Sequence, residues 1–270
     1  MNYHNREWIM YNVYKHYVEA KRIIPRESII GIFLQGSQNY GLDYQNSDID
    51  TKCIITPTFR EIALNKKPHS YTHILENDEH IDIKDIRLYI QTFRKQNLNF
   101  LEILFTDYCW FPNTEYITQW NRLVENRERI ARFDKIRSIK SMMGIASEKY
   151  FAMEHHYPSR MEWIEKYGYD PKQFHHLLRV GEYLNRYIAG EPYSDCLISK
   201  QAEYLKKVKQ GFYSLEEARK IADETYKHIH AKCDEYCEKH KNEPIDKEMD
   251  ELLDDVSYEI MKISVKREIL

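Results

Sequence analysis

The sequence contains little that would suit a membrane protein or a secreted one. None of its 270 residues belong to an apolar run approaching the roughly 20 residues that a membrane span needs. Its first residues, MNYHNREWIMYNVY, lack the basic-then-apolar order of a signal peptide. The chain has only five cysteines, and an odd, scattered set is typical of free thiols in a reducing compartment. We therefore expect a soluble, cytoplasmic protein.

An excess of one charge sign is also missing. The 40 Lys and Arg residues nearly balance 43 Asp and Glu, and the formal net charge is -3. This balance argues against a protein that coats nucleic acid through its overall charge, although a local basic groove is compatible with it. A hydrophobic content of 42% is enough for a core. The length fits one large domain or two modest ones.

Glycine is scarce, with 8 residues in the chain, yet two of them fall in the stretch FLQGSQNYGLDYQNSDIDTKCII. The apolar run Ser28–Leu34 before it predicts a buried strand that breaks at Gly36-Ser37. After a loop, Asp50–Ile55 predicts a second strand. Ile81–Ile86 alternates apolar and charged residues, which predicts a third.

Helical patterns surround these strands. Residues Glu7 to Ile23 predict an amphipathic helix that Pro25 ends. Residues 58–80 are polar and irregular, with room for a short helix. Helical spacing dominates from Ile86 onward, and Tyr108 to Pro112 is the best candidate for a domain boundary.

The second strand brings two carboxylates together. Residues i and i+2 of a strand project to the same face, so Asp48 and Asp50 should lie side by side with Lys52 behind them. Two adjacent carboxylates favour a cation between them, and oxygen ligands select hard ions such as Mg²⁺. Asp82, on the polar face of the third strand, is the predicted third ligand. Asp85 competes for this role, but it precedes a helical run and is expected to be its N-cap.

Gly36-Ser37 adds a possible phosphate cradle. Glycine lets a phosphate approach the backbone, and the following N–H groups and the Ser37 hydroxyl could hold its oxygens. With the three aspartates, this predicts a site for a nucleoside triphosphate and two metal ions. The competing interpretation is a simple turn followed by a polar strand start that Ser47 caps.

These residues resemble a known family. Gly36-Ser37, Tyr40-Gly41 and Ser47-Asp48-Ile49-Asp50 look like the core of the polymerase-β nucleotidyltransferase superfamily. More narrowly, the chain resembles the RNA-repair-pathway, RNA-ligase-associated polymerase-β-like proteins of phages and bacteria, over most of residues 28 to 230. Three later segments add to this resemblance: Leu101–Phe105, Tyr169–Arg179 and Lys209–Glu217. Lys52 departs from it, because we expect an uncharged residue there; it could touch a phosphate or pair with a carboxylate.

The resemblance implies an α+β fold. A small mixed β-sheet nucleotidyltransferase core flanked by helices would occupy residues 1–110. A mainly α-helical domain, residues 111–270, would follow and close over the cleft for nucleotide and acceptor.

The resemblance also implies transfer of a nucleoside monophosphate from an NTP to an RNA end, such as a tRNA end, with release of pyrophosphate. Asp48 and Asp50 would hold two Mg²⁺ ions, which Mn²⁺ could replace. Asp82 would hold the catalytic ion and help activate the acceptor hydroxyl. Ser37 would bind the triphosphate.

A cationic helix supports the same chemistry. At about 100° per residue, Lys172 to Ile188 places apolar residues on one side, whereas the other side carries Lys172, His176, Arg179, Tyr183 and Arg186. Lys172, His176 and Arg179 also match the family motif, and this stripe suits a triphosphate or an RNA backbone. The alternative is a solvated face paired with Glu182 and Glu191. His175 points away from the stripe and is expected to be incidental.

Other interpretations stay open from the sequence alone. The same chemistry could act on a protein hydroxyl, or the chain could be a catalytically silent nucleotide-binding module. The cluster from His228 to His240 resembles a zinc site, but two cysteines four residues apart on a charged helix lack the usual turn.

Overall fold

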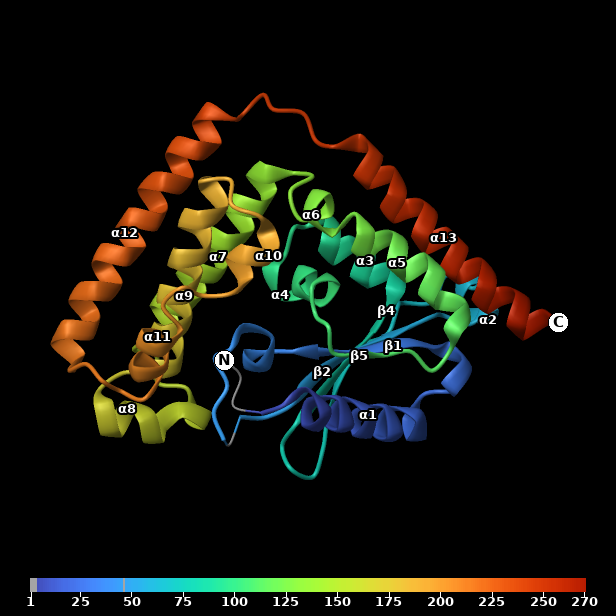
Figure 1. Ribbon diagram of the computed structural model, residues 1–270, viewed down its shortest axis with the longest axis horizontal. Coiled ribbons are helices and arrows are strands. Elements are labelled where there is room, and N and C mark those ends of the chain that lie inside the picture. The colour runs from blue at the N-terminus through green and yellow to red at the C-terminus, as the bar shows by residue number, and fades with distance from the viewer. Residues whose placement is uncertain (1–3, 46) are drawn as a thin grey trace. The chain divides into compact units, whose positions relative to one another are not determined.

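The computed structural model describes residues 4–45 and 47–270 and has an α+β fold, as the sequence predicted (Figure 1). A five-stranded mixed sheet is surrounded by helices, and a mainly helical region follows it. The chain divides into two compact units. The first runs to Phe133 and also contains Ile245–Leu270, while Asp134–Pro244 form the second.

The sheet has the strand order β3-β4-β2-β1-β5. Its strands are β1 (Ile29–Gln35), β2 (Asp50–Ile55), β3 (Ser70–Ile74), β4 (His80–Asp85) and β5 (Cys109–Trp110). β2 and β4 pair in parallel, and the other neighbours are antiparallel.

Three of these strands match the sequence prediction, and two were missed. β3 is a largely exposed edge strand, so it lacks the hydrophobic alternation that would reveal it. β5 has two residues and pairs with Ile32 and Phe33 of β1. The segment from Tyr108 to Pro112 therefore joins the sheet, and the expected domain boundary differs from the division that the structure has.

The helices of the first unit cover both faces of this sheet. They are α1 (Arg6–Ile23), α2 (Phe59–Ala63), α3 (Ile86–Arg94), α4 (Leu98–Leu101), α5 (Ile117–Glu125), α6 (Arg127–Ile130) and α13 (Lys247–Ile269), with short 3-10 turns η1 (Arg26–Ser28), η2 (Ser37–Tyr40), η3 (Glu102–Leu104) and η4 (Thr114–Tyr116). On one face, Ile9 and Val13 of α1 join a core with Cys53 and Ile83. On the other, the ring of Phe33 lies 4.4 Å from that of Trp120 on α5.

The C-terminal helix α13 belongs to the first unit, although the sequence placed it in a second domain of residues 111–270. Arg94 Nε on α3 donates to Asp250 Oδ1 at 2.6 Å, and Ser264 Oγ donates to Thr56 Oγ1 at 2.9 Å. These contacts join residues more than 150 positions apart. No local pattern along the chain could have indicated them.

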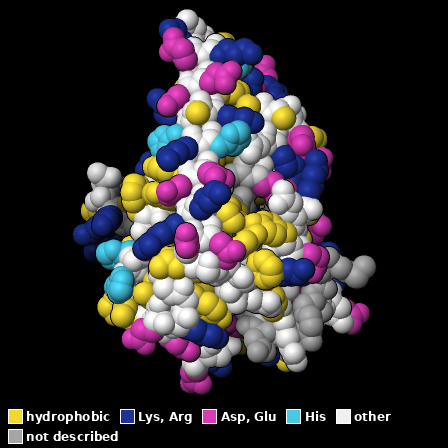
Figure 2. Space-filling model, turned by 90° about the vertical axis from the view of Figure 1, so that its left-hand side faces the viewer, with side chains coloured by type: hydrophobic (Ala, Val, Ile, Leu, Met, Phe, Trp, Pro, Cys, Tyr) yellow, Lys and Arg dark blue, Asp and Glu magenta, His cyan; other side chains and the backbone are white. Residues whose placement is uncertain are grey.

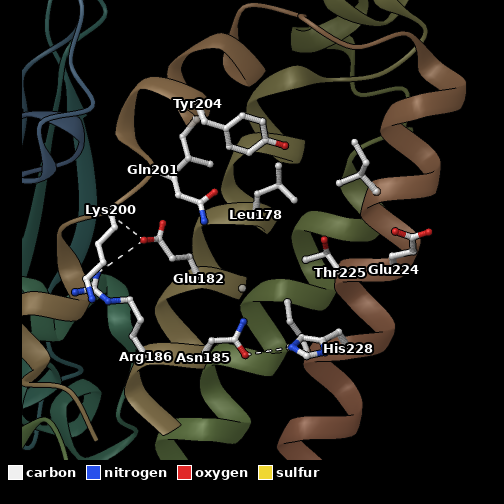
Figure 3. A pocket seen from close by; sticks show the side chains of 14 residues that line it. Leu178, Glu182, Asn185, Arg186, Lys200, Gln201, Tyr204, Glu224, Thr225 and His228 are labelled. Atoms are coloured by element: carbon white, nitrogen blue, oxygen red, sulfur yellow. Dashed lines mark hydrogen bonds and ion pairs between the residues drawn. The ribbon is translucent and has the colours of Figure 1, made fainter. Parts of the chain in front are cut away.

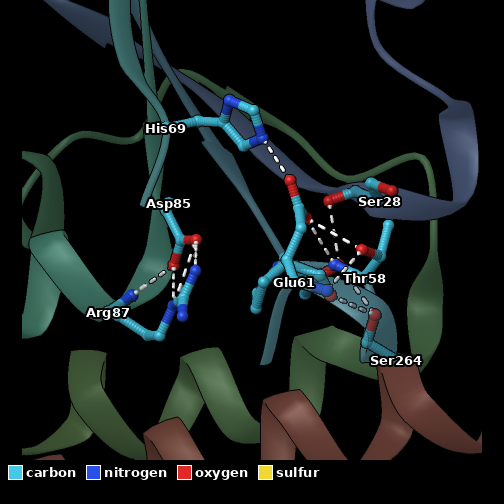
Figure 4. A network of polar contacts seen from close by, with 9 residues as sticks. Ser28, Thr58, Glu61, His69, Asp85, Arg87 and Ser264 are labelled. Atoms are coloured by element: carbon cyan, nitrogen blue, oxygen red, sulfur yellow. Dashed lines mark hydrogen bonds and ion pairs between the residues drawn. The ribbon is translucent and has the colours of Figure 1, made fainter. Parts of the chain in front are cut away.

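A polar network fixes the ends of β2 and β4 (Figure 4). Asp85 is fully buried, and its Oδ1 accepts from the backbone N–H of Arg87 at 2.9 Å, which confirms its predicted role as the N-cap of α3. The Arg87 guanidinium binds the same carboxylate. Nearby, Thr58 and Glu61 form a capping box on α2, and His69 Nε2 lies 2.6 Å from Glu61 Oε1.

The second unit packs around one central helix. Its elements are α7 (Lys135–Ala152), η5 (Pro158–Arg160), α8 (Met161–Tyr167), α9 (Pro171–Ile188), α10 (Tyr193–Leu197), α11 (Ala202–Lys209) and α12 (Leu215–Lys239). α9 contacts α7, α10, α11 and α12. Gly181 allows the close approach of α12, because a Cβ there would lie 3.1 Å from Ile229 Cδ1. Asp170 caps α9 and binds Arg160 through both carboxylate oxygens.

Candidate functional site

The turn after β1 has the open backbone that a phosphate cradle needs. Gly36 has φ 97° and ψ -159°, a conformation that only glycine adopts without strain. A Cβ at Gly36 would meet only Gln38 Oε1, at 3.9 Å, so the space in front of the backbone is open. Ser37 is partly exposed and begins the 3-10 turn η2. Both residues therefore lie where the sequence analysis expected them, at the end of β1.

Three hydrogen bonds hold the segment that carries Asp48 and Asp50. Gln38 Nε2 donates to the carbonyl oxygen of Asp48 at 2.7 Å. The N–H of Ile49 donates to Glu79 Oε1 at 3.0 Å, and the N–H of His80 donates to Asp50 Oδ1 at 3.0 Å. β2 begins at Asp50, so Asp48 lies just before the strand and not within it. Ile49 is buried between two more exposed aspartates, which keeps the alternation that was expected.

Asp50 and Asp82 lie on the same face of the sheet. Lys52 on β2 pairs directly with Asp82 on β4, which places Asp50 beside His80. The Asp50 and Asp82 side chains are 31% and 25% exposed, so both can be reached from solvent. The structure thus places Asp50 and Asp82, two of the three predicted carboxylates, on one face of two paired strands.

Two lysines share this face with the carboxylates. Lys84 Nζ lies 3.7 Å from Asp82 Oδ2, and Lys52 Nζ donates to Gln35 Oε1. The two ammonium groups lie 4.7 Å (Lys52) and 4.2 Å (Lys84) from the centre of the Phe100 ring. Burial lowers the pKa of Lys52 to about 8, while Asp82 acts to raise it.

The three aspartates have the chemistry of ligands for a hard divalent cation, although the structure does not gather them into one ligand cluster. Asp48, Asp50 and Asp82 offer carboxylate oxygens, which are the ligands that Mg²⁺ prefers. Among the described residues, no group of three or more His, Cys, Asp or Glu side chains is arranged to hold a metal ion. Asp50 and Asp82 share one face of the sheet with Lys52 and Lys84, and Asp48 lies before the start of β2.

The sequence did not predict a series of hydrogen-bonded polar side chains that contacts the aspartate segment. His16 of α1 is 1% exposed; its Nδ1 lies 2.9 Å from Thr51 Oγ1 and its Nε2 lies 3.1 Å from Glu79 Oε2. Because a carboxylate can only accept, Nε2 is the donor in its hydrogen bond with Glu79. Glu79 thus links α1 to Ile49, between the two aspartates. These residues are far apart along the chain, and nothing in their local sequence marked them.

The cationic helix is α9, and it agrees only in part with the expected stripe. Lys172 is exposed, while His176 and Arg179 are partly exposed one and two turns further on. Tyr183, however, is buried against Tyr193. Arg186 is bound to Glu191 at 2.9 Å and to the carbonyl oxygen of Ile198 at 2.7 Å. The solvent-facing stripe therefore ends at Arg179, because the next turns pack against α10 and the segment after it.

The two histidines of α9 are held in an environment that disfavours their charged forms. His175 is buried, and its Nδ1 lies 2.8 Å from the carbonyl oxygen of Leu205 on α11, so it joins two helices. Burial lowers the pKa of His175 to about 4. Burial also lowers the pKa of His176 well below its usual range, and Arg179, Lys172 and Lys149 of α7 add to this effect. Lys149 is a cation that the sequence analysis did not place near α9.

The second unit also contains a groove of about 640 Å³ between α9, α11 and α12 (Figure 3). Leu178, Gly181, Leu205, Ile221 and Ile229 are its apolar lining residues. Its polar ones are Glu182, Asn185, Arg186, Lys200, Gln201, Tyr204, Glu224, Thr225 and His228. The His228 imidazole lies 3.3 Å from Asn185 Oδ1. The groove shares no residue with the predicted nucleotide-binding set.

The cluster from His228 to His240 lies along α12 and at its C-terminal end. In the cluster from His228 to His240, Cys233 is buried and His240 Nδ1 lies 2.9 Å from Glu243 Oε2.

On the face shown in Figure 2, basic and acidic side chains are interspersed, in keeping with the balanced composition. None of the helices in the described ranges combines the length and the apolar character that a membrane span requires.

Known protein families and curated proteins give no assignment for this chain. No family model matches the sequence, and no curated protein matches it.

Proposed function

We propose that this protein is a divalent-metal-dependent nucleotidyltransferase that transfers a nucleoside monophosphate from an NTP to an RNA end. The observation that carries the proposal is the arrangement on one sheet face: Asp50 and Asp82 on paired strands, with the open Gly36-Ser37 turn following the neighbouring strand. RNA as the acceptor rests on the family resemblance and on the exposed cations of α9.

Each group of candidate residues would have a separate role in the reaction. Asp48, Asp50 and Asp82 would hold Mg²⁺, which when bound would neutralise phosphate charge and favour ionisation of the attacking hydroxyl. Ser37 and the backbone N–H groups after Gly36 would bind the triphosphate oxygens. On α9, Lys172 and Arg179 would offer positive charge to a phosphate group, and His176, whose lowered pKa favours the neutral form, would offer a hydrogen bond.

The reaction exchanges one bond to phosphorus for another. The acceptor hydroxyl oxygen forms a bond to the α-phosphorus, and the bond from that phosphorus to the bridging oxygen of the pyrophosphate group breaks. The hydroxyl proton leaves to solvent and pyrophosphate is released. Asp82 would hold the catalytic ion and help activate the acceptor hydroxyl.

Incorporation of label from α-labelled ATP, CTP, GTP and UTP tests the proposal. Each nucleotide is given with Mg²⁺ and total RNA, and separately with cell protein. We expect labelled RNA from the wild-type chain and a loss of at least about 100-fold in Asp48→Asn/Asp50→Asn, the scale expected when transition-state charge stabilisation is removed. Asp78→Asn, at an exposed position on the β3–β4 turn, is the matched control and should keep full activity.

Label on protein in place of RNA would replace the RNA acceptor by a protein hydroxyl. Folded protein that binds NTP but labels neither acceptor would contradict the transferase proposal and leave a nucleotide-binding module.

A further inference from the structure

The groove between α9, α11 and α12 lies on a different side of α9 from the cations proposed to bind phosphate. Its floor is one face of α9, which carries Leu178, Gly181, Glu182 and Asn185. At about 100° per residue, this face points roughly 140° away from the cationic stripe. A ligand in the groove would therefore be separate from the triphosphate and from the RNA backbone.

The groove has the size and the apolar walls of a small-molecule site. Its volume of about 640 Å³ lies within the roughly 300–1,000 Å³ that such sites occupy. Aliphatic side chains line it from two helices, with Leu205 on α11 and Ile221 and Ile229 on α12. Gly181 keeps the floor low because it has no side chain. These surfaces suit a flat, largely apolar ring.

Two side-chain amides supply hydrogen-bonding groups (Figure 3). His228 Nε2 lies 3.3 Å from Asn185 Oδ1 and donates to it, because an amide oxygen only accepts. Within the described residues, Asn185 Nδ2 and the side-chain amide of Gln201 have no hydrogen-bond partner. An amide presents a donor beside an acceptor, and this is how Asn and Gln recognise the edge of a nucleobase.

The charged side chains of the groove are already paired and leave no cation for a phosphate. Arg186 and Lys200 both bind Glu191, at 2.9 Å and 3.0 Å. Glu182 accepts a hydrogen bond from the backbone N–H of Lys200 at 2.7 Å. Glu224, which is exposed, adds a negative charge to the lining. The groove therefore favours an uncharged group over an anion.

We propose that this groove is a second binding site, which takes the uncharged base of a nucleoside. The base would pack between the aliphatic side chains and against the ring of Tyr204, and its edge would bind Asn185 and Gln201. Tyr204 is held in place, because its hydroxyl accepts from that of Tyr213 at 3.2 Å. A carbohydrate fits less well, since its hydroxyl groups would face aliphatic side chains without partners.

Calorimetric titration of the full chain with adenosine, guanosine, cytidine and uridine, without metal ions, tests the assignment. We expect at least one of them to bind at one site per chain. Gln201→Met keeps the length of an exposed side chain but removes its amide, and should weaken binding about tenfold. Asn185→Leu should have a similar effect. Gln210→Met and Asn242→Leu, at exposed positions outside the groove, are the matched controls and should bind as wild type.

A four-nucleotide RNA of each base distinguishes the two sources of a nucleobase. Tighter binding of the RNA than of the nucleoside, with the same loss in Gln201→Met, would show that the base belongs to an RNA strand. Equal or weaker binding would show that the ligand is a free nucleoside. Both results support the proposal.

Three results would overturn it: no binding of any nucleoside or RNA, equal binding of ribose, or wild-type affinity in both Gln201→Met and Asn185→Leu. Thermal melting checks that each variant is folded. The inference does not depend on the proposed function, because none of these measurements involves the candidate metal ligands. A failed incorporation assay would therefore leave the expected nucleoside binding unchanged.

Discussion

Glu79 forms hydrogen bonds that hold the loop with the candidate metal ligands. Replacing Glu79 should therefore lower the stability of the protein by a measurable amount. Its side chain is 16% exposed and accepts three hydrogen bonds: from His16 Nε2 at 3.1 Å, Ile49 N at 3.0 Å and Asn77 Nδ2 at 2.7 Å. Glu79→Gln keeps the shape but turns one acceptor into a donor, which then faces another donor.

Replacing a charged acceptor in this position costs about 2 kcal/mol, given about 1.5–3 kcal/mol for hydrogen bonds to charged groups. For a unit of this size, this loss corresponds to a fall in Tm of about 4–8 °C. Thermal and urea unfolding at pH 7 measure it. Glu76→Gln, at an exposed position on the same hairpin, removes the same charge and should change Tm by less than about 1 °C.

The pH dependence gives a second check on Glu79. Burial alone would raise its pKa, but the hydrogen bonds from His16, Ile49 and Asn77 lower the pKa below its usual value of 4.5. The folded state therefore favours the carboxylate. The contribution of ionised Glu79 to the stability is complete above pH 4.5 and disappears as the pH falls through the lowered pKa. Wild type and Glu79→Gln should converge in acid. This reasoning would be refuted if Glu79→Gln and Glu76→Gln lowered the stability equally. It would also be refuted if the stability difference between wild type and Glu79→Gln persisted in acid.

Two further predictions concern buried titratable groups. The pKa of His175 is lowered from 6.5 to about 4, so the fold favours its neutral form and stability should fall as the pH drops from 6.5 toward 4. The contribution is about 3 kcal/mol, and His175→Gln should flatten the slope of the unfolding free energy against pH; an unchanged slope would contradict the assignment. Asp85→Ala removes the cap of α3 and leaves Arg87 without its carboxylate, at a cost of about 3 kcal/mol in urea unfolding. A loss no larger than that of Glu76→Ala would show that the cap is not needed.

Much of the candidate site could be predicted from local sequence. Period-2 alternation located Asp50 and Asp82 on strands, and glycine at position 36 indicated the turn, because strand geometry and positive φ are properties of a few consecutive residues. The cap role of Asp85 was equally local. The α+β class was implied by the family resemblance, and the structure confirms it.

The tertiary structure alone decided which distant residues meet. The pairing of β2 with β4 put Lys52 opposite Asp82, and the return of α13 moved the C-terminus into the first unit. Long-range packing also buried Tyr183 and placed Glu79 behind the aspartate loop. Such contacts depend on how elements far apart in sequence bury their apolar surfaces together, and a sequence pattern records only which surfaces are apolar.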